Sequence, residues 1–122
     1  MLIFYRATIE SVLRYSISSW FGNLTVKFKS QIMSLVKAAG KIMGMSIPLT
    51  PQKIFEDSTI RLADKILSDP AHVLNSEYEL LRSGMRYRVP MCRLNKYKFS
   101  FVPLSIGLLN KRSSEGGQNR RR

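Results

Sequence analysis

A chain of 122 residues, 44% of them hydrophobic, is long enough to form one hydrophobic core but short for two. Twenty Lys and Arg against eight Asp and Glu give a net charge of +12, which favours a polyanionic partner: nucleic acid first, an anionic membrane surface second. The single cysteine, Cys92, excludes an intrachain disulfide and a zinc site built from cysteine pairs. No run of about twenty apolar residues occurs, so we expect no transmembrane segment.

The longest apolar-periodic run covers residues 4–22, and it predicts one helix of that length. Arg6, Glu10 and Arg14 repeat every four residues on one side, and Glu10 precedes Arg14 in the order that favours an ion pair. Because no residue before Phe4 can cap this helix, we expect the chain to begin inside a longer reading frame. The apolar residues expected on the opposite side recur at three- and four-residue spacing: Tyr5, Ile9, Val12, Leu13 and Trp20.

A second helix is predicted over residues 26–43, where Thr25 is a suitable N-cap and Gly44 a suitable stop. Its apolar face carries Phe28, and lysines occupy much of its polar face. Gly40 weakens a helix by about 1 kcal/mol relative to alanine, which indicates that close packing requires a glycine there.

A third helix is predicted over residues 51–69. Thr50 supplies an N-cap and Pro51 a first helical residue, and Asp69 before Pro70 ends the helix because proline disfavours a helical residue before it. The three predicted helices are amphipathic and joined by short loops. The fold class is therefore mainly α, with a small three-helix bundle over residues 1–70.

After the bundle we expect a basic, largely irregular or extended segment over residues 71–110, packed on the bundle. Alternating cations and rings over residues 96–101 have the two-residue period of extended chain. A short helix is expected over residues 103–110, followed by a disordered basic tail, residues 111–122, that contains no apolar residue. The candidate site residues of this segment are Arg82, Arg86, Arg88, Arg93, Lys96, Lys98, Tyr87 and Tyr97.

Arginine and lysine neutralise nucleic-acid phosphates, and tyrosine rings stack on unpaired bases. The candidate residues therefore predict contact with RNA or DNA. A second interpretation stays open, in which the rings pack on the helices and the charges simply lie in water. The net charge has a second interpretation as well, as one side of a larger assembly whose acidic part lies elsewhere.

Several stretches occur in an order and spacing that resemble the region near the C-terminus of LINE-type (non-LTR) retrotransposon reverse transcriptases. The resemblance covers about residues 4–110 and implies a fragment that lies downstream of the polymerase palm, towards the end of the polyprotein. The stretches are FYRATIESVLRYSISSWFGN, KAAGKIMG, RLADKILSDPAHVLN, ELLRSGMRYRVP and FVPLSIGLLN.

The resemblance implies no catalytic residue in this chain. Polymerases of that family bind two magnesium ions through an Asp-Asp motif, and this sequence contains no Asp-Asp pair. His72 is the only histidine, which excludes a two-histidine metal site. We therefore expect a non-enzymatic protein without metal or cofactor, whose partners are RNA or DNA and the rest of the parent polyprotein.

The sequence leaves two alternative functions open. The first is a helical protein-interaction module that uses the exposed apolar face of the first helix, including for self-association. The second is a cationic amphipathic protein at a membrane surface, for which Lys27, Lys37 and Lys41 of the second helix are suited. Charges within the first apolar run argue against a signal peptide, so we expect a location in the cytoplasm or nucleus.

Overall fold

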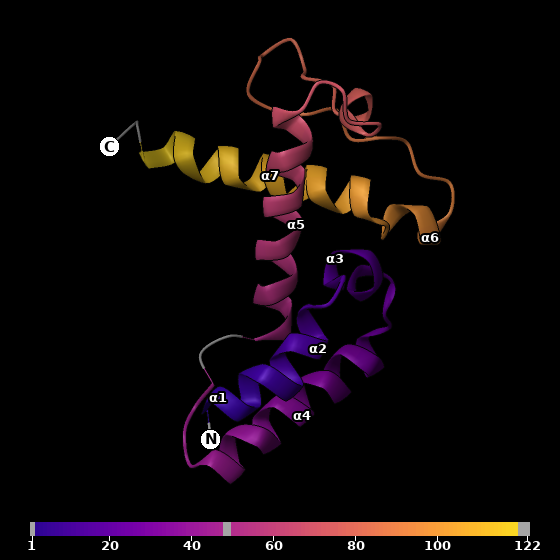
Figure 1. The fold of residues 1–122 in the computed structure, drawn as a ribbon. Coiled ribbons are helices and arrows are strands. Elements are labelled where there is room, and N and C mark those ends of the chain that lie inside the picture. The colour runs from indigo at the N-terminus through magenta and orange to yellow at the C-terminus, as the bar shows by residue number, and fades with distance from the viewer. Residues whose placement is uncertain (1, 48–49, 120–122) are drawn as a thin grey trace. The chain divides into compact units, whose positions relative to one another are not determined.

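The computed structural model describes residues 2–47 and 50–119, and it is mainly helical (Figure 1). No strand forms among these residues, which agrees with the predicted mainly-α class. The chain divides into two compact units, Met1–Ser58 (unit 1) and Thr59–Arg122 (unit 2). The division lies inside a helix, α5 (Pro51–Ser68), whereas the sequence places the end of the bundle near residue 70.

Unit 1 begins with a series of short helical pieces, so the prediction of one continuous helix over residues 4–22 is wrong. Ser16 has a φ of 47°, in the left-handed region that ends a helix, and the indole Nε1 of Trp20 donates to the Tyr15 carbonyl at 2.9 Å beside this break. The pieces are α1 (Leu2–Tyr5), the π-helix η1 (Arg6–Glu10), α2 (Ser11–Arg14), α3 (Ile17–Trp20) and the 3₁₀-helix η2 (Phe21–Asn23).

The π-helix changes which side chains of this segment are buried. A π turn holds an extra residue, so side chains five apart share a face across it. Glu10, expected on the outer side, is 8% exposed, whereas Val12, expected inside, is 70% exposed. The predicted ion pair still forms, because Arg14 Nε donates to Glu10 Oε1 at 2.9 Å. The buried side chains are Tyr5, Glu10, Leu13, Ile17 and Phe21.

Tyr5 is buried as well, and it lies near Glu10. Burial of the phenol, and then the nearby Glu10 carboxylate, raise the pKa of Tyr5. Both effects favour the neutral phenol. Other apolar side chains of the segment face solvent, including Phe4 and Tyr15.

The helix α4 (Val26–Met43) has the bounds that the sequence predicts. The Thr25 hydroxyl accepts from the Phe28 amide at 3.4 Å, and Gly44 ends the helix with a φ of 68°. The expected packing reason for Gly40 is present: a Cβ there would lie 2.9 Å from the Met45 carbonyl oxygen. The chain turns back tightly because the Met45 amide donates to the Gly40 carbonyl at 3.0 Å.

The helix α5 begins where Thr50 and Pro51 predict, since the Thr50 hydroxyl accepts from the Lys53 amide at 3.3 Å. Its first half belongs to unit 1, where the rings of Phe21 and Phe55 lie 5.2 Å apart. Its second half belongs to unit 2. The core cluster of unit 2 joins this half of α5 to a C-terminal helix, α7 (Phe101–Asn119), through Ala63, Ile66, Tyr78, Ile106 and Leu109.

Two predictions for the C-terminal region are wrong. Residues 96–101, expected to be extended, contain most of a short helix, α6 (Asn95–Lys98), and the start of α7. The expected helix over 103–110 is the middle of α7, and the tail expected to be disordered is helical as far as Asn119. Residues 120–122 lie outside the described residues. An apolar periodicity does not reveal the polar contacts that α7 makes as far as Ser114.

The close approach at Gly40 predicts an unusual response to alanine. Gly40→Ala should destabilise the protein by roughly 1–3 kcal/mol despite the better helix propensity of alanine, because the new methyl group meets backbone. Urea unfolding followed by circular dichroism measures this. Gly107→Ala in α7 is the matched control, since nothing lies within 4 Å of its Cβ position, and it should stabilise by up to about 1 kcal/mol. Equal changes in the two variants would contradict the packing argument.

Candidate nucleic-acid interface

Half of the predicted basic residues lie on a short hairpin-like loop of unit 2, residues 79–88, which we call the basic arch. Its two sides pair through an isolated antiparallel bridge between Leu80 and Tyr87. The Arg88 amide donates to the Glu79 carbonyl, and the Leu81 amide to the Arg86 carbonyl, each at 2.8 Å. The turn needs Gly84, whose φ is 68°. These hydrogen bonds hold the backbone that carries Arg82, Arg86 and Arg88 in a defined conformation.

Asn110 of α7 anchors the basic arch. The Tyr87 amide donates to Asn110 Oδ1 at 2.8 Å, and Asn110 Nδ2 donates to the Tyr87 carbonyl at 3.1 Å. One side-chain amide thus satisfies both backbone groups of Tyr87. Because these groups are part-buried, losing the pair would leave polar atoms without partners.

Two serines one turn further along α7 add contacts to the same loop. The Ser113 hydroxyl donates to the Met85 carbonyl at 2.8 Å, and Arg86 NH2 donates to the Ser114 hydroxyl at 3.1 Å. Two residues of the stretch that the sequence assigned to a tail, Ser113 and Ser114, thus contact the basic arch.

Tyr87, predicted to stack on bases, is instead packed against the core of unit 2. Its ring lies edge-on to Tyr78, with centroids 6.1 Å apart and planes at 90°. Tyr78 is itself buried and its hydroxyl is 2.7 Å from the Ser105 hydroxyl. Burial raises the pKa of Tyr78. The Tyr87 ring therefore packs on the core of unit 2 and is not free to stack on a base.

The six predicted cations are all exposed. Within the described part of the chain, only Arg88 among them has an acidic partner, Glu79 at 3.5 Å, and both side chains are largely in solvent. Such an exposed pair contributes little energy and opens readily to another anion. The arch therefore presents Arg82, Arg86 and Arg88 to solvent.

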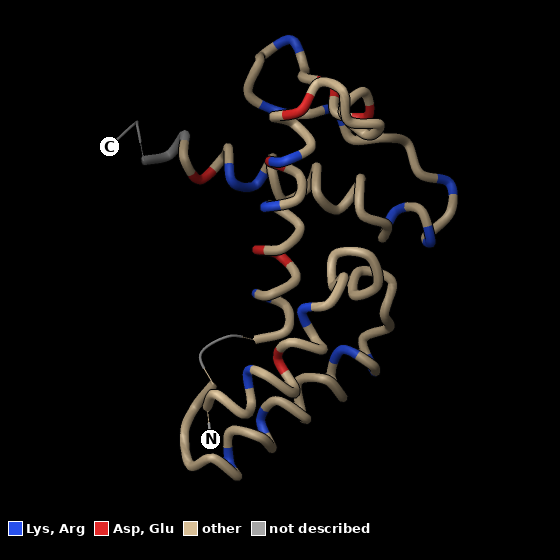
Figure 2. The backbone as a smooth tube through the Cα atoms, in the orientation of Figure 1, with Lys and Arg blue, Asp and Glu red and all other residues tan. Residues whose placement is uncertain are grey.

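The other three cations lie on and before α6: Arg93, Lys96 and Lys98. The two groups do not form one cluster, because α6 ends just before the start of α7, whereas the arch docks at Asn110 (Figure 1). At 1.5 Å per residue, the intervening helix separates them by roughly 14 Å. Figure 2 shows Lys and Arg in both regions. A stacked strand with a phosphate every 3.4 Å or so would place about four phosphates across this interval.

Tyr97 differs from Tyr87, because it keeps 42% of its surface exposed and lies among the cations of α6. The nearby Phe99 ring is engaged by the Lys98 ammonium, which lies 5.9 Å from its centroid. Of the two predicted tyrosines, Tyr97 is therefore the one with a ring free to stack.

Residues that the sequence prediction omitted complete this site. Arg112 of α7 forms a bidentate pair with Asp64 of α5, at 3.0 and 2.9 Å, and hydrogen bonding to Asp64 raises the pKa of Arg112. Lys111, between Asn110 and Arg112, is exposed and adds a cation beside the arch. In the sequence, the only indication that α7 makes polar contacts here is Asn110, a polar residue directly after an apolar helical stretch.

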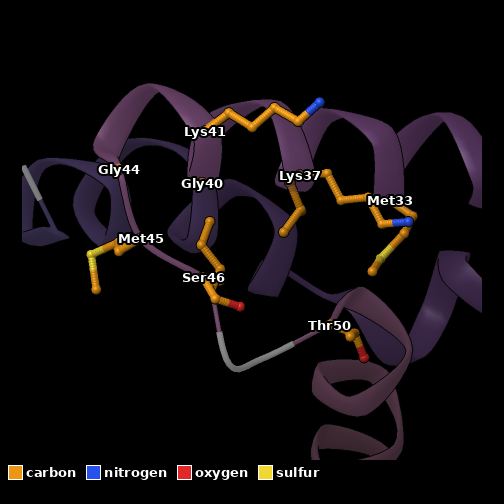
Figure 3. A pocket seen from close by; sticks show the side chains of 10 residues that line it. Met33, Lys37, Gly40, Lys41, Gly44, Met45, Ser46 and Thr50 are labelled. Atoms are coloured by element: carbon orange, nitrogen blue, oxygen red, sulfur yellow. The ribbon is translucent and has the colours of Figure 1, made fainter.

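Unit 1 contains a hollow of about 500 Å³ near the end of α4 (Figure 3). Its polar groups are lysine, serine and threonine, and Lys41 runs along α4 away from Ser46 and Thr50. In the described ranges, no group of three or more His, Cys, Asp or Glu is arranged to hold a metal ion. No described helix is both long enough and apolar enough to cross a membrane.

Comparison of the chain with protein families, with curated proteins and with solved structures finds no match.

The double hydrogen bond of Asn110 predicts that this residue controls the order of the arch. In Asn110→Ala, the Tyr87 amide should exchange with deuterium about tenfold faster or more, since one lost hydrogen bond corresponds to roughly 1–1.5 kcal/mol. Hydrogen–deuterium exchange resolved over residues 79–88 measures this. Lys111→Ala is the matched control, because it removes the adjacent exposed side chain. Unchanged exchange in Asn110→Ala would contradict the anchoring role.

Proposed function

We propose that this chain binds single-stranded RNA or DNA through unit 2, and that it acts by binding rather than by catalysis. The cations of the basic arch and of α6 neutralise phosphates along one strand, and Tyr97, among the cations of α6, stacks on an unpaired base. Lys111 extends the basic surface beside the arch. The observation that carries this proposal is the anchored arch, whose three arginines are exposed and of which only Arg88 has an acidic partner among the described residues.

Electrostatics supports a polyanionic ligand in particular. Like charges held in one loop repel each other, and phosphates relieve that repulsion while releasing counterions. The arch is anchored to α7 mainly by Asn110 and Ser113, and its arginines stay exposed. The resemblance to the C-terminal region of LINE-type reverse transcriptases is consistent with such a role, as a non-catalytic part of a protein that handles RNA and DNA.

The test is the salt dependence of binding to a labelled single-stranded RNA, measured by fluorescence anisotropy. Each neutralised phosphate on a single strand contributes about −0.7 to the log–log slope, so a slope of about −3 corresponds to roughly four contacts. The variant Arg82→Glu, Arg93→Glu, Lys96→Glu should flatten the slope by about 2. These three side chains make no described hydrogen bond or ion pair, so their reversal leaves the arch intact.

The matched control reverses three cations of unit 1, Lys27→Glu, Lys37→Glu and Lys41→Glu. It changes the net charge by the same amount on exposed positions of α4. We expect its slope to stay close to that of the unmodified chain. Equal weakening in both variants would mean that net charge alone attracts RNA. Absence of binding at low salt would overturn the proposal altogether.

A further inference from the structure

The helix α4 carries a stripe of residues that the described part of unit 1 leaves exposed. Phe28, Leu35 and Ile42 recur every seven residues, and Gln31 and Ala38 each follow three residues later in the same repeat. We call these five residues the α4 stripe. Phe28 and Leu35 are each 52% exposed and Ile42 is 77% exposed. The alternating spacing of three and four residues is the pattern by which one helix packs along another.

The α4 stripe lies beside the buried face of the helix rather than on it. The residues of α4 buried in the structure are Val36, Ala39 and Gly40, which occupy a different arc. The stripe extends from residue 28 to residue 42, roughly 21 Å or four turns at 1.5 Å per residue. This length suits a contact with a single partner helix.

The first half of the α4 stripe lines a groove. It has a volume of about 340 Å³ and is lined by Trp20, Leu24, Phe28, Gln31, Ile32 and Leu35. The Trp20 indole is already bonded to the Tyr15 carbonyl, so Gln31 supplies the polar side chain of the wall. An apolar wall with one amide favours an aliphatic or aromatic side chain from a partner.

The charge of α4 restricts the nature of that partner. The helix carries Lys27, Lys29, Lys37 and Lys41 and no acidic residue (Figure 2). Lys27 lies four residues before Gln31 and Lys41 three residues after Ala38, so both lysines border the same side of the stripe. Two copies of α4 packed together would oppose lysines, which is unfavourable. Acidic residues on a partner helix would instead pair with them and fix its register.

A lipid surface fits the α4 stripe less well. A helix that lies in a headgroup layer presents a broad apolar face, whereas this stripe is narrow and interrupted by Gln31 and Ala38. Ala38 instead permits a partner side chain or backbone to approach closely.

We propose that the α4 stripe is a docking surface for an amphipathic helix of a partner protein, with an apolar heptad stripe flanked by acidic residues. Partner side chains enter the groove between Phe28 and Leu35, and partner carboxylates pair with Lys27 and Lys41. This surface is independent of the basic arch, since all its residues belong to unit 1 and those of the arch to unit 2.

The experiment uses the full chain and a fluorescent synthetic peptide of about four heptads, with leucine and isoleucine at the a and d positions and glutamate at e and g. We expect saturable binding by anisotropy. A second peptide with lysine in place of glutamate should bind at least about tenfold more weakly, because its charges oppose the lysines of α4.

Two sets of variants locate the binding. Phe28→Ser, Leu35→Gln and Ile42→Gln together should weaken the acidic peptide by about tenfold or more, as expected for loss of the apolar contacts of a docking surface. These side chains are largely exposed, so the variant should fold, and circular dichroism checks this. The matched control, Val12→Ser with Tyr15→Ser, removes exposed apolar side chains of unit 1 outside the stripe and should bind normally.

Three outcomes would overturn the proposal. If both peptides bind equally, or if neither binds, the lysines of α4 do not select an acidic partner. Sedimentation that shows a dimer abolished by the stripe variant means that a second copy occupies the surface. Flotation with vesicles of phosphatidylcholine and phosphatidylserine that depends on the stripe means that lipid does. The variant Arg82→Glu, Arg93→Glu, Lys96→Glu should bind the peptide normally, so failure of RNA binding and failure of this proposal are distinguishable.

Discussion

The arrangement of unit 2 depends on the bonding of one side-chain amide with one backbone residue. A loop that carries three arginines gains little from exposed ion pairs, and only its Tyr87 ring reaches the core. Asn110 anchors the loop, because its side chain accepts a hydrogen bond from the Tyr87 amide and donates one to the Tyr87 carbonyl. The Tyr87 ring is thereby directed onto Tyr78 in the core. The charged loop is thus fixed from its backbone side, and its cations are left for solvent.

The same principle explains why α7 is longer than its apolar residues require. Helices in proteins are stabilised mainly by tertiary contacts, and these contacts need not be apolar. Arg112 is paired with Asp64, and Ser113 and Ser114 contact the basic arch. A composition without apolar residues normally indicates disorder because nothing is buried. Here the loop and the helix satisfy each other, which neither segment reveals when it is considered alone.

Features with a local cause were predictable from the sequence. The start of α4 at Thr25 and of α5 at Thr50 follows from hydroxyl caps, and the end of α4 follows from the glycine conformation at Gly44. Features with a tertiary cause were not. A π turn at Arg6–Glu10 and a left-handed Ser16 have no reliable residue signature, and both change which side chains are buried. The cations of the candidate site stay a prediction, and Asn110, which holds the backbone of the arch, was not among the predicted residues.

Two surfaces of different physical character lie on two separately packed units. The basic arch offers charge held by polar contacts, so binding there should weaken steeply with salt. The α4 stripe offers apolar area bordered by lysines, so salt should affect its specificity more than its affinity. Because Phe55 of α5 packs in unit 1 and Ile66 in unit 2, each surface is supported by its own core. The two proposed ligands, a nucleic acid and a partner helix, would therefore contact different side chains and would not compete for them.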